Sequence, residues 1–311
     1  MKRKPAIDYR DPEVRREVLI RQRRGMWTPE QVASLAGHFR LRPGMKLLDA
    51  ACGYGYVMRT WGPYCLPGGR LVGLDLDRNL IAGARRRLRP PALKQAASFV
   101  TGDICAMPLP DDEFDAVIAS VVFCHLAEPE RALDEMVRVA KPGGCVVVLD
   151  NARTGGAGAG WQSWCDPTVE ERVAACEMFE RTCRGRKQLG QGDYSVGCYV
   201  PGWLEARGLE DVGARTNERV IWIAPPYRSP EQRTALRNAR ERLRAGGRAR
   251  FDRHTREQAL AGGCTEEQLR EQARGDRLAR RRFGRALAAG TAAFAWSTGS
   301  FWAIWGFKPR P

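Results

Sequence analysis

Residues 46–149 alternate between short apolar runs and segments with a helical pattern, and this alternation constrains the fold more than any other feature. The apolar runs lie at residues 46–49, 70–75, 98–102, 116–120 and 145–149, and helical segments begin at about 56, 79 and 129. Strands separated by helices are typical of βαβ units and a parallel sheet. Because the runs are almost continuously apolar, both faces of the sheet should be covered. The expected fold class is therefore α/β, with helices on both faces of a mostly parallel sheet.

The regions on either side of this core are predicted to be largely helical. Before it, Thr28 and Gln31 form a capping-box pattern that starts a helix running to about residue 39. After it, the expected elements are a helix capped by Asp166 and running to about 184, a helix at 201–207, a strand pair or one bent strand at 209–224, a charged helix from 230, capping boxes at Thr255–Gln258 and Thr265–Gln268, and an aromatic strand at 300–307.

Charge and cysteine content limit the kind of protein. The net charge is +15, and residues 228–285 alone hold seventeen arginines against eight acidic residues. Such an excess indicates an anionic partner or a general bias towards arginine.

The ten cysteines have no zinc-type spacing, so we expect free thiols and no metal. No apolar run approaches the about 20 residues that span a bilayer, and we expect a cytoplasmic location.

The first two strands end in residues that suit a nucleoside ligand. Asp49 ends the first strand and leads into the glycine-containing turn Ala50–Gly55. Glycines at such a turn let the backbone approach a ligand closely, and ligands bind at the carboxyl ends of the strands in open α/β sheets. Asp75 ends the second strand, where a carboxylate can accept both ribose hydroxyls.

Four ordered motifs carry a family resemblance. They are LLDAACGYG (47–55), LVGLDLD (71–77), VTGDICAMPLPDDEFDAVIAS (100–120) and PERALDEMVRVAKPGG (129–144). Together they resemble the class I S-adenosylmethionine (SAM)-dependent methyltransferases, in particular the small-molecule branch that includes the ubiquinone/menaquinone C-methyltransferases. The resemblance implies a Rossmann-like, seven-stranded, mostly parallel sheet with helical lid insertions. It also implies that residues 301–309 (FWAIWGFKP) contain a final antiparallel strand.

The resemblance assigns a cofactor site for SAM and for its product S-adenosylhomocysteine. In it, Asp49 and the glycine loop hold the methionine moiety, Asp75 the ribose, and Asp103 the adenine amino group. The full set of implied cofactor-binding residues is Tyr9, Arg21, Asp49, Ala51, Gly53, Gly55, Asp75, Leu76, Asp103, Ile104 and Ser120.

One alternative is a nicotinamide-dependent dehydrogenase, which would need GxGxxG directly after the first strand. The sequence here is AxCGxG, and Asp49 precedes it. A pyrophosphate would be repelled by Asp49, whereas SAM carries an ammonium and a sulfonium, so charge favours SAM. Ala51 stands where the family's first loop glycine is usual, as in some quinone-type members.

The same resemblance organises the whole chain. We expect N-terminal helices that cap the cofactor (1–42), a SAM-binding core (43–151), a lid or substrate-binding insertion (152–200), a continuation of the core (201–227), a basic helical insertion (228–298) and the final strand (299–311). The acceptor should be a quinone, a lipid-like compound or a specialised metabolite. His125 is a candidate general base, and Trp161, Trp164, Phe179 and Tyr194 are candidate substrate contacts.

Two other functions remain open at this point. The basic segment 228–285 could bind RNA for an RNA methyltransferase, although only Phe251 interrupts its polar sequence with an aromatic ring between residues 228 and 282, so base-stacking platforms are scarce. Alternatively, the protein could be a non-catalytic SAM-binding assembly protein. In either case the helical insertions could mediate a homodimer.

Overall fold

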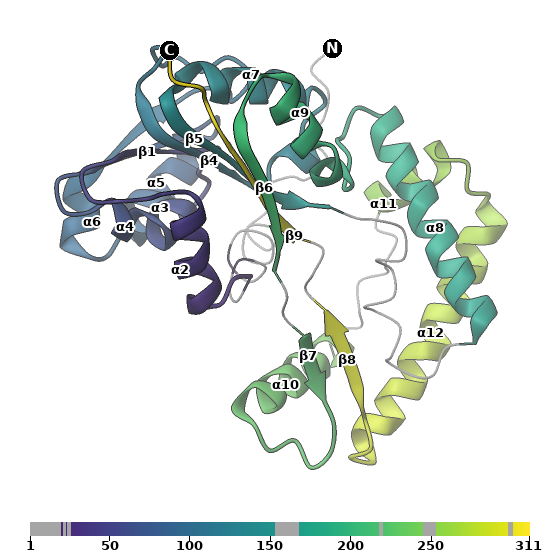
Figure 1. Cartoon of the computed structure of the whole chain (residues 1–311). Helices are drawn as coiled ribbons and strands as arrows, with labels where there is room; N and C mark the ends of the chain where they lie inside the picture. The colour runs from purple at the N-terminus through teal and green to yellow at the C-terminus, as the bar shows by residue number, and fades with distance from the viewer. Residues whose placement is uncertain are drawn as a thin grey trace. The chain divides into compact units, whose positions relative to one another are not determined.

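The structure, a computed structural model, describes residues 20, 23, 26–152, 168–217, 220–244, 253–297 and 301–311. The chain divides into two compact units, both drawn in Figure 1. The sheet unit comprises residues 1–152, 194–217 and 301–311, and the helical unit comprises residues 153–193 and 218–300. One large apolar core lies in the sheet unit, and two small ones lie in the helical unit.

The sheet unit is built on a seven-stranded sheet in the order β3-β2-β1-β4-β5-β9-β6 (Figure 1). Its strands are β1 (Lys46–Ala50), β2 (Arg70–Asp75), β3 (Ala97–Thr101), β4 (Phe114–Ser120), β5 (Ala140–Asn151), β6 (Glu210–Thr216) and β9 (Phe301–Phe307). Strands β1 to β5 are parallel, while β9 runs antiparallel to both β5 and β6. The predicted seven-stranded, mostly parallel sheet with a late antiparallel strand is confirmed.

Strand order explains why helices cover both faces. From β1 the chain moves outward one way to β2 and β3, and from β4 it moves the other way to β5. Because parallel crossovers are right-handed, helices of the two halves lie on opposite faces. The first half contributes α3 (Tyr56–Thr60), α4 (Gly62–Cys65), α5 (Arg78–Arg87) and α6 (Pro91–Ala96), and the second contributes α7 (Pro129–Val139) and, before β6, α9 (Val200–Ala206) (Figure 1).

The helix before the sheet begins as predicted. Helix α2 (Pro29–His38) starts with a capping box in which Thr28 Oγ1 accepts from Gln31 N and Gln31 Oε1 accepts from Thr28 N. The core beneath is continuous, because every residue of β1 from Leu47 to Ala50 is buried. Register then aligns the carboxyl ends of the strands: Asp49 lies beside Gly73 of β2 and Ile118 of β4.

The helical unit contains α8 (Val169–Gln188), α10 (Pro230–Arg244), α11 (Arg253–Ala261), α12 (Glu266–Ala288) and the antiparallel pair β7 (Val220–Ile223) and β8 (Phe294–Ser297). Helix α11 packs on α8 around Met178 and Ala259, and α10 packs on α12 around Leu236 and Phe283. In chain order the basic segment lies between β6 and β9, two strands of the main sheet that pair with each other.

Several local expectations were wrong. Helix α8 is capped by Thr168, in a capping box with Glu171, and not by Asp166. Thr255 lies inside α11, which begins at Arg253, whereas the box at Thr265 is present. Residues 142–144 form an irregularity within β5, where Gly143 has a φ of +76° and donates its N–H to Lys308 O.

Residues 209–224 contain two strands, but these belong to different sheets and do not pair with each other. Strand β6 pairs with β9 and strand β7 with β8, which the sequence analysis did not anticipate. The proline-rich segment after β7 is a turn, in which Tyr227 N donates to Ala224 O.

Candidate functional site

A tight loop of left-handed residues follows β1. The φ angles of Ala51, Gly53 and Gly55 are +62°, +51° and +71°. Cys52 N donates to Leu74 O at 2.8 Å, which ties the loop to β2, and Gly55 N donates back to Cys52 O at 2.7 Å. A left-handed backbone turns the chain sharply without a Cβ clash at glycine. The loop therefore lies at the carboxyl end of the sheet, where Asp49 and Asp75 also end their strands.

Asp75 is held by this loop. Its Oδ2 accepts from Gly53 N at 2.7 Å and its Oδ1 from Asp77 N at 2.9 Å. Burial raises the pKa of Asp75 above its usual value, and the two backbone donors partly oppose this shift. A carboxylate offers about four acceptor positions. Two acceptor positions of Asp75 therefore remain for ligand hydroxyls.

Asp49 is a buried carboxylate with little to neutralise it. Only 2% of its surface is exposed, and its Oδ2 accepts from Met58 N at 3.3 Å. Burial raises its pKa to about 7, while the Met58 N–H and the charge of Arg23 act in the opposite direction. A buried carboxylate of this kind is stabilised by a cation, which is what SAM would bring to the site.

The end of β3 adds the third expected carboxylate. Gly102 N donates to Asp75 O at 3.1 Å, which connects this strand end to the glycine-loop region. Asp103 Oδ1 accepts from Cys105 N at 2.9 Å, and the neighbouring Ile104 is buried. By contrast, Leu76 leaves 71% of its side chain exposed, which is unusual for a leucine that follows a core strand.

The loop after β4 is fixed by Asp150 at the end of β5. Asp150 is fully buried, and its Oδ2 accepts from the N–H groups of Val122, Phe123 and Cys124 at 2.9, 2.8 and 3.4 Å. Its Oδ1 accepts from Asn151 N. These bonds hold the short 3-10 helix Phe123–His125, so Asp150 positions the candidate base His125. Sequence reasoning gave Asp150 no such role.

Arg23 is a second residue that sequence reasoning missed. It is 8% exposed, and it donates to Ser120 Oγ at 2.9 Å and to Ser120 O at 3.0 Å. Its guanidinium lies 5.6 Å from the ring centroid of Tyr56. Since the Arg23–Ser120 contact spans 97 residues of sequence, no local pattern could have separated Arg23 from its arginine-rich neighbours. Arg23 brings a positive charge to the strand ends that carry Asp49 and Asp150.

Three of the candidate substrate residues are among those that the structure describes: His125, Phe179 and Tyr194. His125 is half-buried, and its ring meets that of Tyr194 edge-on, with centroids 6.3 Å apart. Phe179 lies on α8 of the helical unit. Tyr9, Arg21, Trp161 and Trp164 lie outside the described residues. Of the candidate substrate residues, the structure therefore brings together His125 and Tyr194.

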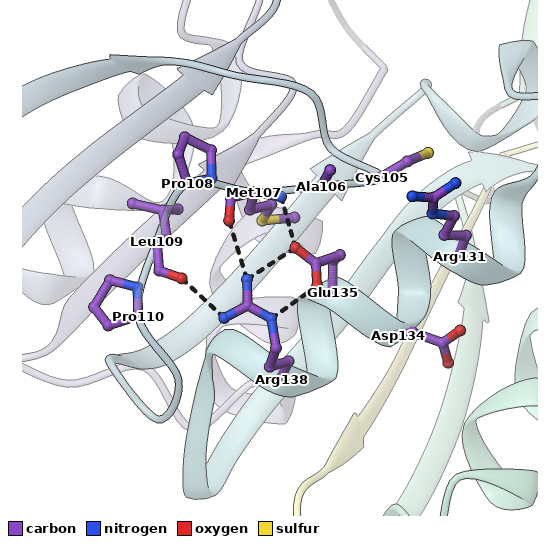
Figure 2. A pocket seen from close by; sticks show the side chains of 10 residues that line it. All are labelled: Cys105, Ala106, Met107, Pro108, Leu109, Pro110, Arg131, Asp134, Glu135 and Arg138. Carbon is purple, nitrogen blue, oxygen red and sulfur yellow. Dashed lines mark hydrogen bonds and ion pairs between the residues drawn. The ribbon is translucent and has the colours of Figure 1, made fainter.

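Figure 2 shows a charged surface hollow of about 690 Å³ between the 105–110 segment and α7. Arg138 fills one end of it, bonded to Glu135 and to the carbonyl oxygens of Leu109 and Met107. Glu135 in turn accepts from Met107 N at 2.6 Å. None of the residues expected to hold the cofactor lines this hollow. The lining groups form hydrogen bonds with one another, so we interpret the hollow as a contact region between the 105–110 segment and α7 and not as a ligand site.

Other kinds of site can be assessed only for the part of the chain described. There, no group of three or more histidine, cysteine or acidic side chains has a metal-binding arrangement. Nine cysteines in that part are free thiols. No helix among the described elements combines the length and apolarity needed to cross a membrane.

Comparison with known proteins supports the same interpretation. The family described as "Methyltransferase domain" matches residues 48–148. A demethylmenaquinone methyltransferase of Symbiobacterium thermophilum is 32% identical over 127 residues, which is 41% of this chain and 49% of the relative. A sterol 24-C-methyltransferase of Gibberella zeae is 36% identical over 191 residues, covering 61% of this chain and 47% of the relative.

A solved structure agrees on the fold. The protein, described as a "putative methyltransferase" from Bacillus halodurans C-125, matches with a TM-score of 0.50 and 16% identity, over 90% of this chain and 99% of that chain. Residues 48–148 are therefore a methyltransferase domain of the class I SAM-dependent type, and the resemblance is confirmed for this part of the molecule. The chain spans about half the length, or less, of the curated relatives it matches.

Proposed function

We propose that this protein binds SAM at the carboxyl ends of β1, β2 and β3 and transfers the methyl group to an apolar small molecule of the quinone or sterol kind. The observation that carries this proposal is the convergence of Asp49, Asp75 and the loop around Gly53. Two buried carboxylates at one loop would repel a pyrophosphate, whereas they attract a ligand that carries positive charge and ribose hydroxyls.

The residues fit such a cofactor on chemical grounds. The ionised form of Asp49 compensates a buried ammonium, and the two unused acceptor positions of Asp75 match two neighbouring ribose hydroxyls. In this proposal Asp103, whose Oδ1 accepts from Cys105 N, accepts from the adenine amino group with its other oxygen. The exposed Leu76 offers an apolar surface for a flat ring. SAM supplies a methyl group on a sulfonium that is already activated for displacement.

In the proposed reaction, the protein acts mainly by aligning the nucleophile with the methyl group of SAM. Rigid strand ends fix the carboxylates, and Asp150 fixes the segment that carries His125, so a nucleophile approaching over the β4 loop meets a defined geometry. Where the nucleophile carries a proton, His125 accepts it, with Tyr194 packed against its ring. Quinone, sterol and squalene acceptors appear in the names of the relatives, and these names support an apolar acceptor here.

Calorimetry with SAM and S-adenosylhomocysteine tests the proposal. We expect micromolar binding of both, a loss of about a hundred-fold in Asp75→Ala, and a change of only a few-fold in His125→Ala. Asp75→Asn serves as the matched control, because it keeps an acceptor for Gly53 N. If neither compound binds, the proposal is refuted. If His125→Ala loses more affinity than Asp75→Ala, the ribose assignment is wrong.

Turnover separates an enzyme from a non-catalytic SAM-binding assembly protein. The measurement is release of S-adenosylhomocysteine in the presence of a reduced naphthoquinone or a sterol. Turnover with either acceptor excludes the assembly alternative, and binding without turnover on a broad acceptor panel supports it.

A further inference from the structure

Helix α12 of the helical unit carries a row of exposed arginines. Beyond Glu271, every exposed side chain of this helix is an arginine apart from Leu278 and Ala288. The arginine stripe, as we call it, consists of the exposed residues Arg270, Arg274, Arg277, Arg281 and Arg285. No ion pair involves any of these five arginines among the described residues.

Helix geometry places the stripe on one face. At 100° per residue, its five positions fall within an arc of about 80°, and along the axis they span about 22 Å. The buried residues Leu269, Phe283 and Leu287 lie roughly 130° away and pack into the helical unit. The stripe is therefore a straight row of five guanidinium groups directed to solvent while the opposite face is held by packing.

Arginine-rich composition alone does not explain this arrangement. Helix α8 of the same unit is also rich in charge, but it mixes signs along its length and forms internal pairs such as Arg181–Glu177. On α12, Arg282 lies off the stripe and is paired with Glu171. From Arg270 to Arg285, charges of one sign are thus segregated on one face of the helix, and Glu267 lies on this face only at its N-terminal end. Such segregation raises self-repulsion unless a polyanion faces the arginines.

We propose that the arginine stripe of α12 docks this protein on an anionic lipid surface. A straight row on a single helix can reach a plane with all five arginines at once. Each arginine near such a surface strengthens binding by about five-fold, because about 1 kcal/mol is gained per basic residue. This role rests on the proposed function, because an acceptor of low water solubility resides in a bilayer and docking would bring the protein to the surface that holds it.

Two observations favour lipid over nucleic acid. Leu278 leaves 55% of its side chain exposed and lies on the edge of the stripe, next to Arg277. An exposed leucine gains free energy by entering the acyl boundary of a bilayer but gains nothing from a phosphate backbone. Moreover, Phe283 is the only aromatic residue of α12, and it is buried, so no ring on this helix can stack on a base.

The experiment compares three full-length proteins for flotation with vesicles. The stripe variant is R274Q/R277Q/R281Q/R285Q, in which glutamine retains helix propensity. The control variant is R42Q/R70Q/R86Q/R89Q, which removes the same charge from exposed arginines of the sheet unit. Vesicles contain phosphatidylcholine alone or with about 30% phosphatidylglycerol, and a short single-stranded RNA is the competing probe.

We expect the unaltered protein to float with the anionic vesicles only. The stripe variant should lose on the order of several hundred-fold in vesicle affinity, and the control variant less than about ten-fold. Leu278→Gln should weaken vesicle binding by several-fold and leave any RNA binding unchanged. Circular dichroism of each variant identifies a change that only unfolds α12.

Two results would overturn the proposal. One is equal vesicle binding by the stripe and control variants. The other is stripe-dependent RNA binding that is tighter than vesicle binding and insensitive to Leu278→Gln, which would assign the face to nucleic acid. Because vesicle binding is measured without SAM or acceptor, its failure is distinguishable from a failure of the proposed methyl transfer.

Discussion

The two units of the molecule treat charge in opposite ways. The sheet unit buries three carboxylates, those of Asp49, Asp75 and Asp150, and each accepts at least one backbone N–H. The described part of the helical unit buries no carboxylate and one arginine, Arg186, and its other arginines lie largely on the surface. Buried charges are costly unless they are compensated, so they persist where geometry or a ligand requires them. The contrast agrees with the two proposals, which assign chemistry to the sheet unit and membrane association to the helical unit.

The variant expected to change the free energy of unfolding most, and so to test this contrast, is Asp150→Ala. It leaves the N–H groups of four residues, 122–124 and 151, without their acceptor in a buried site. We expect the free energy of unfolding to fall by about 3 kcal/mol or more, measured by urea denaturation. Asp150→Asn should lose less, because one acceptor oxygen stays. Asp211→Ala, which removes an exposed ion pair with Arg40, should cost less than about 1 kcal/mol. Similar losses in Asp150→Ala and Asp211→Ala would contradict the contrast.

The pH dependence of SAM binding should be the next largest effect. Burial raises the pKa of Asp49 to about 7, so this carboxyl group is mostly protonated at pH 6 and mostly ionised at pH 8. A cationic ligand prefers the ionised form, and its affinity should therefore rise about ten-fold between these pH values, with protons released on binding. Calorimetry in two buffers measures both quantities.

Asp49→Asn is the control for this titration. It should bind SAM weakly and with little pH dependence between 6 and 8. An unchanged pH dependence would assign the titration to another group. In the protein without ligand, the same raised pKa contributes stability that is present below about pH 4 and is lost as the pH rises through about 7.

A smaller effect concerns the backbone of the glycine loop. Ala51 has a φ of +62°, a conformation that costs a non-glycine residue about 1 kcal/mol or more. Ala51→Gly relieves this strain but adds freedom to the unfolded chain, so we expect a net change of less than about 1 kcal/mol. Ala50→Gly, one residue earlier in extended β1, has no strain to relieve and should be clearly destabilising. Equal losses in the two variants would show that the loop is not strained at Ala51.

The smallest expected effect lies in the helical unit. Glu171→Gln removes the ion pair with Arg282, whose two side chains are each about one-third exposed at a distance of 2.7 Å. Glutamine still completes the capping box with Thr168, so the change isolates the charge. We expect a loss of about 0.5 kcal/mol in urea denaturation. A loss comparable to that of Asp150→Ala would mean that buried charge also organises this unit.

Local chemistry explains which elements could be predicted. Strands such as β1 and β4 are buried along most of their length, so their sequences are mainly apolar and easily recognised. The capping boxes at Thr28 and Thr265 depend on residues three positions apart. The similar pattern at Thr255 failed because α11 begins two residues earlier, at Arg253, and packing on α8 outweighs the local signal. Strand β8 escaped notice because its partner β7 is about seventy residues away.

The candidate site shows the same limit. Asp49 and Asp75 lie at the carboxyl ends of β1 and β2, and Asp103 closely follows β3, so sequence order alone located them. Asp150 also lies near the end of a strand, but it can hold the β4 loop only because β4 and β5 are neighbours in space. The position of Arg23 depends on its contact with Ser120, 97 residues away in sequence. Residues proposed to touch a ligand could thus be located from the sequence, whereas those that position them could not.

Strand β9 has a consequence for how the protein is made. In chain order it is the last strand of the sheet, yet it lies between β5 and β6. While a ribosome synthesises the basic segment, β5 has an open edge of unpaired peptide groups and β6 has no neighbour. Open edges of this kind recruit other chains. The nascent protein must therefore keep its unfinished sheet from aggregating throughout synthesis of residues 218–300, and assembly of the sheet unit ends only when β9 inserts.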